Sequence, residues 1–198
     1  MSEVTHAFER LAAAHRTMGS PLPEFFNPPA LPAQLAKTSS MLGYPIPLQL
    51  ADLYAMADGI DLDRWMATYG GVPAYLLPGW GFPSLSYARL RTEELTRIAR
   101  SLSFSDAAEV ELWRDDWLMV FTALTTGDEH IVAATDVEAG SLWTVRWEFE
   151  APTRLGYEMA GLLDAAAARF RSLDARWDPV SRIIVWDDDL SDRLDSFP

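Results

Sequence analysis

The chain has 198 residues, of which 49% are apolar and 12% aromatic, so it can fold around a core and global disorder is excluded. Its 16 basic and 29 acidic residues give a net charge of −13. Nucleic acid and anionic membrane surfaces are therefore not expected partners, whereas a basic protein is. Cysteine is absent, which excludes disulfides and thiolate metal sites. Without an apolar run of ~20 residues or a signal peptide, we expect a cytoplasmic protein.

The N-terminal part predicts a helix followed by an irregular arm. Residues 3–18 have apolar side chains at helical spacing, and Gly19 ends that pattern. Five prolines between residues 21 and 32 exclude regular structure there, so we predict an extended arm. Phe25 and Phe26 are expected to pack this arm onto the body of the protein.

Three further helices and a loop-rich stretch are predicted between residues 31 and 102. Apolar residues at helical spacing indicate helices over 31–42, 50–58 and 91–102. Between the last two, residues 60–90 are rich in glycine and aromatic residues. That composition predicts loops around one short strand at 74–77.

Residues 117–149 change to a period of two, which is typical of a sheet. Turn sequences TTGD and DVEAG separate three β-branched and aromatic runs, which are 117–122, 130–135 and 142–149. In the third run Trp143, Val145 and Trp147 alternate with polar residues. We therefore expect these three side chains to be buried on one face of an antiparallel sheet.

A helix over 157–173 and an edge strand over 182–186 are predicted to close the chain. The order of helices, sheet and helix predicts an α+β fold, a central antiparallel sheet with helices before and after it in a single domain. We expect residues 1–30 to form an N-terminal helix and proline-rich arm, residues 31–173 the domain itself, and residues 174–198 an acidic C-terminal extension.

Three segments carry a resemblance to a known family. LAKTSSMLGYPIPLQLADLYAMADG has a short helix, a glycine, a proline-led second helix and a final acidic residue with glycine. WLMVFTALTTGDEHIVAATDVEAGSLWTVRWE is similar to a three-stranded meander, and LLDAAAARFRSL to a closing helix. In this order the segments resemble the SUKH superfamily, which includes Smi/Knr-type yeast cell-wall regulators and bacterial immunity proteins. The resemblance covers residues 31–173; the long stretch at 60–90, the arm and the acidic tail depart from it.

The resemblance implies a protein-binding domain without catalytic activity or cofactor. Bacterial members are similar to immunity proteins that neutralise a toxin, often a nuclease. Nuclease toxins tend to be basic, so a neutralising protein with a net charge of −13 would be attracted to them and could occupy the site that binds phosphates. A regulatory scaffold that binds an endogenous protein is the alternative. A metal-dependent hydrolase that uses loop carboxylates is the third and least favoured function.

Motifs for catalysis or metal binding are weak in this sequence. His6, His15 and His130 do not have ligand spacing, and HExxH, GxSxG and a phosphate-binding glycine loop are absent from the sequence. The acidic clusters are Asp61 with Asp63, Asp115 with Asp116, and the run Asp187–Asp189. None of them has the spaced pattern of a calcium loop. We therefore predict surface or packing roles for the histidines, no metal site and no hydrolytic activity.

Tryptophans beside acidic residues predict a protein-binding surface. Three stretches distant in sequence combine the two kinds of residue, and the members are Asp61, Asp63, Trp65, Trp80, Asp115 and Asp116. Binding hot spots are built from a large apolar anchor inside a charged rim. We expect the acidic residues to set the association rate and the tryptophans the dissociation rate. The alternative is that the tryptophans cover the open end of the sheet.

Overall fold

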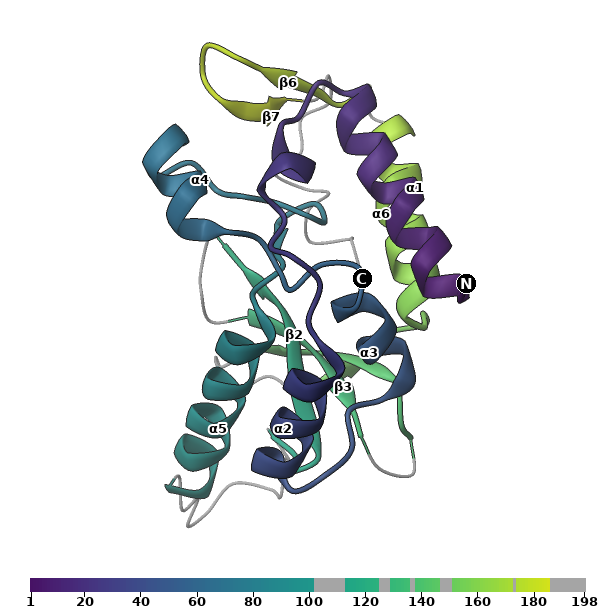
Figure 1. The fold of residues 1–198 in the computed structure, drawn as a ribbon, viewed down its shortest axis with the longest axis vertical. Coiled ribbons are helices and arrows are strands. Elements are labelled where there is room, and N and C mark those ends of the chain that lie inside the picture. Colours follow the sequence, from purple (N-terminus) through teal and green to yellow (C-terminus); the bar gives the residue numbers. More distant parts are fainter. Residues whose placement is uncertain (102–112, 125–128, 136–137, 147–150, 173, 186–198) are drawn as a thin grey trace.

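The computed structural model describes residues 1–101, 113–124, 129–135, 138–146, 151–172 and 174–185, and these form one α+β domain, as predicted (Figure 1). The helices are α1 (Glu3–Thr17), η1 (Leu22–Phe25, a 3₁₀ turn), α2 (Pro32–Leu42), α3 (Leu48–Tyr54), α4 (Leu62–Tyr69), α5 (Leu85–Ser101) and α6 (Met159–Ser172). The strands are β1 (Trp80–Gly81), β2 (Trp117–Ala123), β3 (Glu129–Ala134), β4 (Leu142–Arg146), β5 (Thr153–Arg154), β6 (Arg176–Asp178) and β7 (Ile183–Val185). None of the described helices has the length and apolar character needed to cross a membrane.

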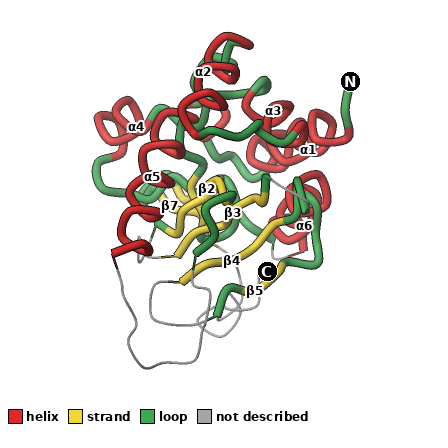
Figure 2. Tube along the Cα trace, turned by 90° about the horizontal axis from the view of Figure 1, so that it is seen from below, coloured by secondary structure: helices red, strands yellow, loops and turns green. Residues whose placement is uncertain are grey.

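The central sheet is the antiparallel meander that the period of two predicts. Its strand order is β1-β2-β3-β4-β5, and in Figure 2 the helices lie mainly along one side of it. Val145 is buried as expected, but Trp143 is only partly buried, because it lies on β4 beside the two-residue strand β5. Trp147 lies outside the described residues.

Helix α5 is fixed to the sheet by an irregularity in β2. The pairing of β2 with β3 shifts between Met119 and Phe121. The Met119 N–H donates instead to Thr92 Oγ1 of α5 at 3.0 Å, and both groups are buried. A bulge of this kind frees a backbone donor, which would be costly to bury without a partner.

The N-terminal residues belong to the same core as the rest of the domain. Helix α1 packs along α6 (Figure 1), where Leu11 is fully buried and the His15 ring lies 4.9 Å from the Phe170 ring. Phe25 is buried and Phe26 packs against the core, as predicted. The expected division between an arm at 1–30 and a domain beginning at 31 therefore does not separate two bodies.

The stretch at 60–90 is more ordered than the sequence predicted. Helix α4 was expected as loop, α5 begins at Leu85 rather than near 91, and the short strand is β1 rather than 74–77. The helix expected over 50–58 is α3, which ends at Tyr54. Gly59 lies beyond the end of this helix. A Cβ at Gly59 would lie 2.4 Å from the backbone of Pro83, so glycine there allows two chain segments to touch.

The expected edge strand at 182–186 pairs in a hairpin and not with the central sheet. Strand β7 is paired with β6 alone among the described strands, and the two form a separate two-stranded sheet. Trp177 fixes the hairpin to the rest of the domain. Its backbone N–H donates to the Met18 carbonyl at 2.7 Å, and its ring packs on Trp65 and Tyr69. Part of the predicted extension thus contacts the domain.

Candidate binding site

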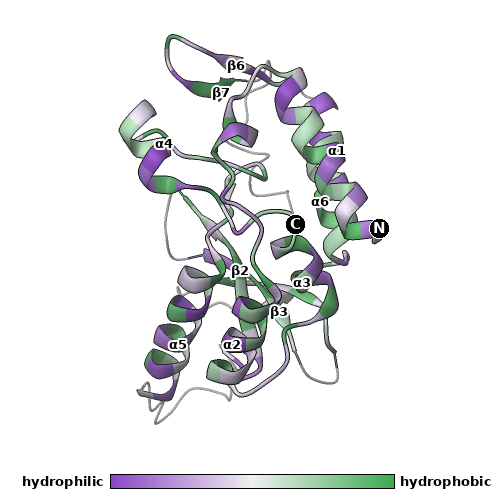
Figure 3. Cartoon of the chain, viewed as in Figure 1, coloured by the Kyte–Doolittle hydropathy of each residue, from purple (hydrophilic) through white to green (hydrophobic). Residues whose placement is uncertain are grey.

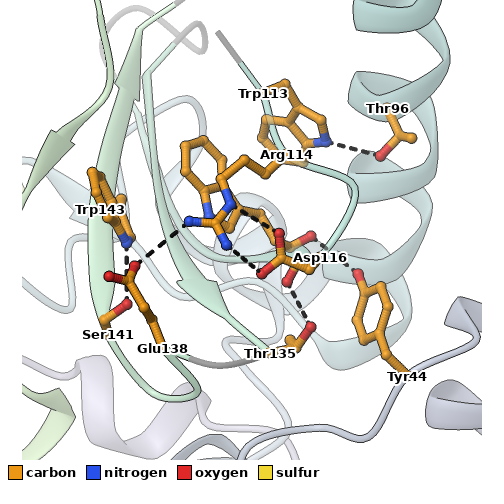
Figure 4. Close-up of polar contacts among 10 residues, drawn as sticks. Tyr44, Thr96, Trp113, Arg114, Asp116, Thr135, Glu138, Ser141 and Trp143 are labelled. Atoms are coloured by element: carbon orange, nitrogen blue, oxygen red, sulfur yellow. Dashed lines mark hydrogen bonds and ion pairs between the residues drawn. The ribbon is translucent and has the colours of Figure 1, made fainter. Parts of the chain in front are cut away.

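The strongest polar cluster of the described residues centres on Arg114, at the entrance to β2 (Figure 4). Its guanidinium forms two bonds to Asp116, Nε to Oδ1 at 3.0 Å and Nη2 to Oδ2 at 3.2 Å. Nη1 lies 3.5 Å from Glu138 Oε2. Only 22% of the Arg114 side chain and 21% of the Asp116 side chain are exposed, so solvent screens this pair far less than a surface pair.

Three tryptophans surround this ion pair and fix its place. Trp117 is the central ring, with the rings of Trp113 and Trp143 each centred 5.7 Å from it and the Arg114 guanidinium carbon 5.7 Å above it. The outer indoles are anchored through their N–H groups, Trp113 to Thr96 at 2.9 Å and Trp143 to Ser141 at 3.1 Å. Arginine stacked on indole adds cation–π attraction to the ion pair.

A cavity of about 580 Å³ opens beside this cluster, and Glu138 belongs to both. Its other charged or polar lining side chains are Gln49, Ser141, Arg154, Tyr157 and Glu158. Glu138 lies 3.6 Å from Arg154 through Oε1, so one carboxylate joins Arg114 to Arg154. Such mixed charge suits the binding of polar groups.

The opposite side of the cluster is formed by Asp115 and Tyr44. Asp115 is exposed and accepts from Arg100 Nη2 at 2.6 Å. The Tyr44 hydroxyl donates to the Trp117 carbonyl at 3.0 Å. Burial, followed by the nearby negative charge of Asp116 and Asp115, raises the pKa of Tyr44, so this phenol keeps its proton and acts as a donor.

The structure does not bring the six predicted site residues onto one surface. Asp61 and Asp63 lie at the start of α4, whereas Asp115 bonds to the last turn of α5, at the other end of the molecule in Figure 1. Asp61 is the N-cap of α4, since its carboxylate accepts from the Arg64 N–H at 3.0 Å.

Trp65 and Trp80 are buried in the core rather than exposed in loops, so the expectation of two tryptophan anchors on an open loop surface is corrected. The folding of α4 turns Trp65 inward, where it is 2% exposed. Trp80 belongs to β1 and pairs with Ala123 of β2. The alternative interpretation, that these rings cover the sheet and its surroundings, fits their burial.

Sequence reasoning found Asp116 but missed Glu138 and Arg154, which are connected to it through Arg114. Glu138 lies in the segment DVEAG, which was interpreted only as a turn. No spacing signal links residues 114, 138 and 154, because strand pairing brings them together. Within the described ranges, no group of three or more His, Asp or Glu side chains could hold a metal ion.

Comparison of the chain with models of known protein families finds no match, and neither does comparison with curated proteins. The resemblance to the SUKH superfamily therefore stays a prediction.

Replacing Asp116 by alanine is expected to lower the free energy of unfolding by about 2 kcal/mol, because it leaves a largely buried guanidinium short of its main acceptor. Urea denaturation followed by circular dichroism measures the change. Asp115→Ala is the matched control and should leave stability unchanged, since its ion pair is open to solvent. Equal losses in the two variants would contradict a structural role specific to Asp116.

Proposed function

We propose that this chain is a non-enzymatic, SUKH-type binding domain that neutralises a basic protein toxin by forming an equimolar complex. One observation carries the proposal, which is the uneven distribution of charge. Residues 102–112 and 186–198 together hold eight of the 29 acidic residues and one of the 16 basic residues. These two short segments therefore carry −7 of the chain's net charge of −13.

Acidic residues of the described fold are largely engaged within it. Asp58 accepts from the Leu85 N–H at the start of α5, Asp61 caps α4, and Asp164 accepts two bonds from Arg10. These carboxylates stabilise helix ends and helix pairs. The acids of the two segments have a different use in the proposal, which is to attract a basic partner and occupy the site where it would hold phosphates.

The test is protection of cells from a toxin. A basic toxic protein encoded beside this chain's gene is expressed with and without the chain, and growth is measured. Restored growth, together with an equimolar complex on size-exclusion chromatography with light scattering, is the expected result. Capture of an endogenous protein without protection would favour the regulatory scaffold instead.

Charge reversal at Asp115 is expected to slow association with the basic partner severalfold and to flatten its salt dependence. Asp115 is exposed and follows the acidic segment 102–112 in sequence, so it lies in the proposed field. Surface plasmon resonance at several salt concentrations compares Asp115→Lys with Asp63→Lys, an equal charge change at α4. A larger decrease of the association rate in Asp63→Lys would indicate that the interface lies at α4. Equal decreases in the two variants would indicate that net charge alone attracts the partner.

A further inference from the structure

Helices α2 and α5 are neighbours in the fold (Figure 1), and residues of both line a surface groove. Two depressions, of about 240 and 320 Å³, follow this groove, and Met41 lines both. Met41 is 51% exposed and gives the groove an apolar surface where the two depressions meet. The two depressions can therefore be treated as one elongated surface, here called the α2–α5 groove.

The walls of the α2–α5 groove are regular helix faces. From α2 they include Gln34, Lys37, Thr38 and Met41, and from α5 they include Ser86, Arg89, Glu93, Thr96, Arg97 and Arg100. Both sets recur at helical spacing, and Figure 3 shows hydrophilic and hydrophobic positions interspersed along both helices. The α5 set spans about 21 Å, or about four helical turns. A helix of that length is the element that best fits a groove of this shape.

The lining of the groove carries four basic residues, Lys37, Arg89, Arg97 and Arg100, and three acidic residues, Asp58, Glu93 and Asp115. Arg89 is paired with Glu93, and Arg100 with Asp115. Lys37 on one wall and Arg97 on the other make no ion pair with any residue that the structure describes. Lys37 lines the smaller depression and Arg97 the larger one, and Met41 lies in both.

We infer that the α2–α5 groove binds an amphipathic helical segment of a protein partner, with carboxylates on its flanks. An apolar side chain of that segment packs on Met41, and its carboxylates pair with Lys37 and Arg97. Charge complementarity favours this occupant, because a basic helix would meet Lys37 and Arg97, which form no ion pair within the part of the chain that the structure describes. Asp115, which lies in the field proposed to attract a basic toxin, also lines the larger depression, where it is paired with Arg100.

The probe is a fluorescently labelled synthetic peptide of about four helical turns, with leucines on one face and glutamates on both flanks. Fluorescence anisotropy measures its binding to the full chain. The double variant Lys37→Gln with Arg97→Gln is expected to bind about tenfold more weakly. Arg16→Gln with Arg171→Gln removes the same charge from exposed positions of α1 and α6 and should leave binding unchanged. A peptide with lysine in place of glutamate should not bind.

Other outcomes overturn the assignment. Failure of the acidic peptide to bind, or equal weakening in the two double variants, would reduce the groove to a surface feature. Met41→Ala tests the apolar contact separately, because a half-exposed side chain can be shortened without loss of the fold, which circular dichroism verifies. The remaining occupant is a second copy of this chain, and sedimentation of the chain alone tests for it. A dimer that dissociates in the Lys37→Gln, Arg97→Gln double variant would assign the groove to a second copy.

Discussion

Replacing Trp65 by alanine is expected to lower the free energy of unfolding by about 4 kcal/mol. The indole is 2% exposed, and ring centroids of Tyr69, Phe25 and Trp177 lie 4.6, 5.1 and 5.9 Å from it. Its N–H donates to the Val72 carbonyl at 2.7 Å. Alanine would leave a cavity among these rings and a carbonyl without its donor. Urea denaturation followed by far-ultraviolet circular dichroism measures the loss.

Met66→Ala provides the control for this experiment. Met66 is the next residue of the same short helix but is 52% exposed, so its truncation changes helix composition without opening a cavity. We expect it to cost less than about 1 kcal/mol. Similar losses in the two variants would show that α4 as a whole, and not the buried ring, determines stability. A stable Trp65→Ala protein would contradict the packing itself.

The burial of Trp65 also changes how partner binding can be probed. A variant that loosens the ring cluster around Trp65 and Trp177 would alter the attachment of the β6–β7 hairpin at the same time. Faster dissociation of a partner from such a variant would then report on the fold as well as on contact. Exposed Asp115, and Lys37 and Arg97 of the α2–α5 groove, are better positions because their side chains do not support the core.

Periodicity predicted those elements whose burial is long and regular. Strands β2 and β3 are nearly continuous apolar runs that the structure buries on both faces, and helix α6 repeats apolar residues over enough positions for its inner face to be assigned from sequence. Helix α4 has eight residues, of which only Trp65 is fully buried, so its inner face is too short to give a period. Its capping residue Asp61 was therefore interpreted as a surface acid instead of a helix start.

The candidate site was only half accessible to sequence reasoning, for a related reason. Asp115 and Asp116 are neighbours in the chain, but one is exposed beside Arg100 and the other is enclosed with Arg114. Both residues lie in the turn before β2, closed by the Trp117 N–H bond to the Arg114 carbonyl, and there the two carboxylates reach different partners, so an acidic pair does not act as a unit. The link from Arg114 through Glu138 to Arg154 depends on strand pairing, which local composition does not encode.

Stability is expected to fall by about 4 kcal/mol when the pH is lowered from neutrality to near 5, because two histidines are buried in neutral form. His15 donates from Nε2 to the Leu76 carbonyl at 2.9 Å and accepts from Ser20 at Nδ1, and burial lowers its pKa to about 4. Burial, and then the charge of Arg91, lower the pKa of His130 to about 4. Its ring nitrogens have no hydrogen-bond partner among the residues that the structure describes.

The sign of this dependence follows from the unfolded state, where a histidine has a pKa of about 6.5. Below that pH the histidines of the unfolded chain are protonated, whereas His15 and His130 of the folded chain stay neutral until the pH approaches 4. The free energy of unfolding therefore falls as the pH falls toward 4. Urea denaturation near neutral pH and near pH 5 measures the loss. His130→Leu, which exchanges an unpartnered buried ring for an apolar side chain, should remove about half of it, and His6→Gln, at an exposed position, should remove none. An unchanged pH dependence in His130→Leu would mean that His130 is already charged, or solvated, in the folded protein.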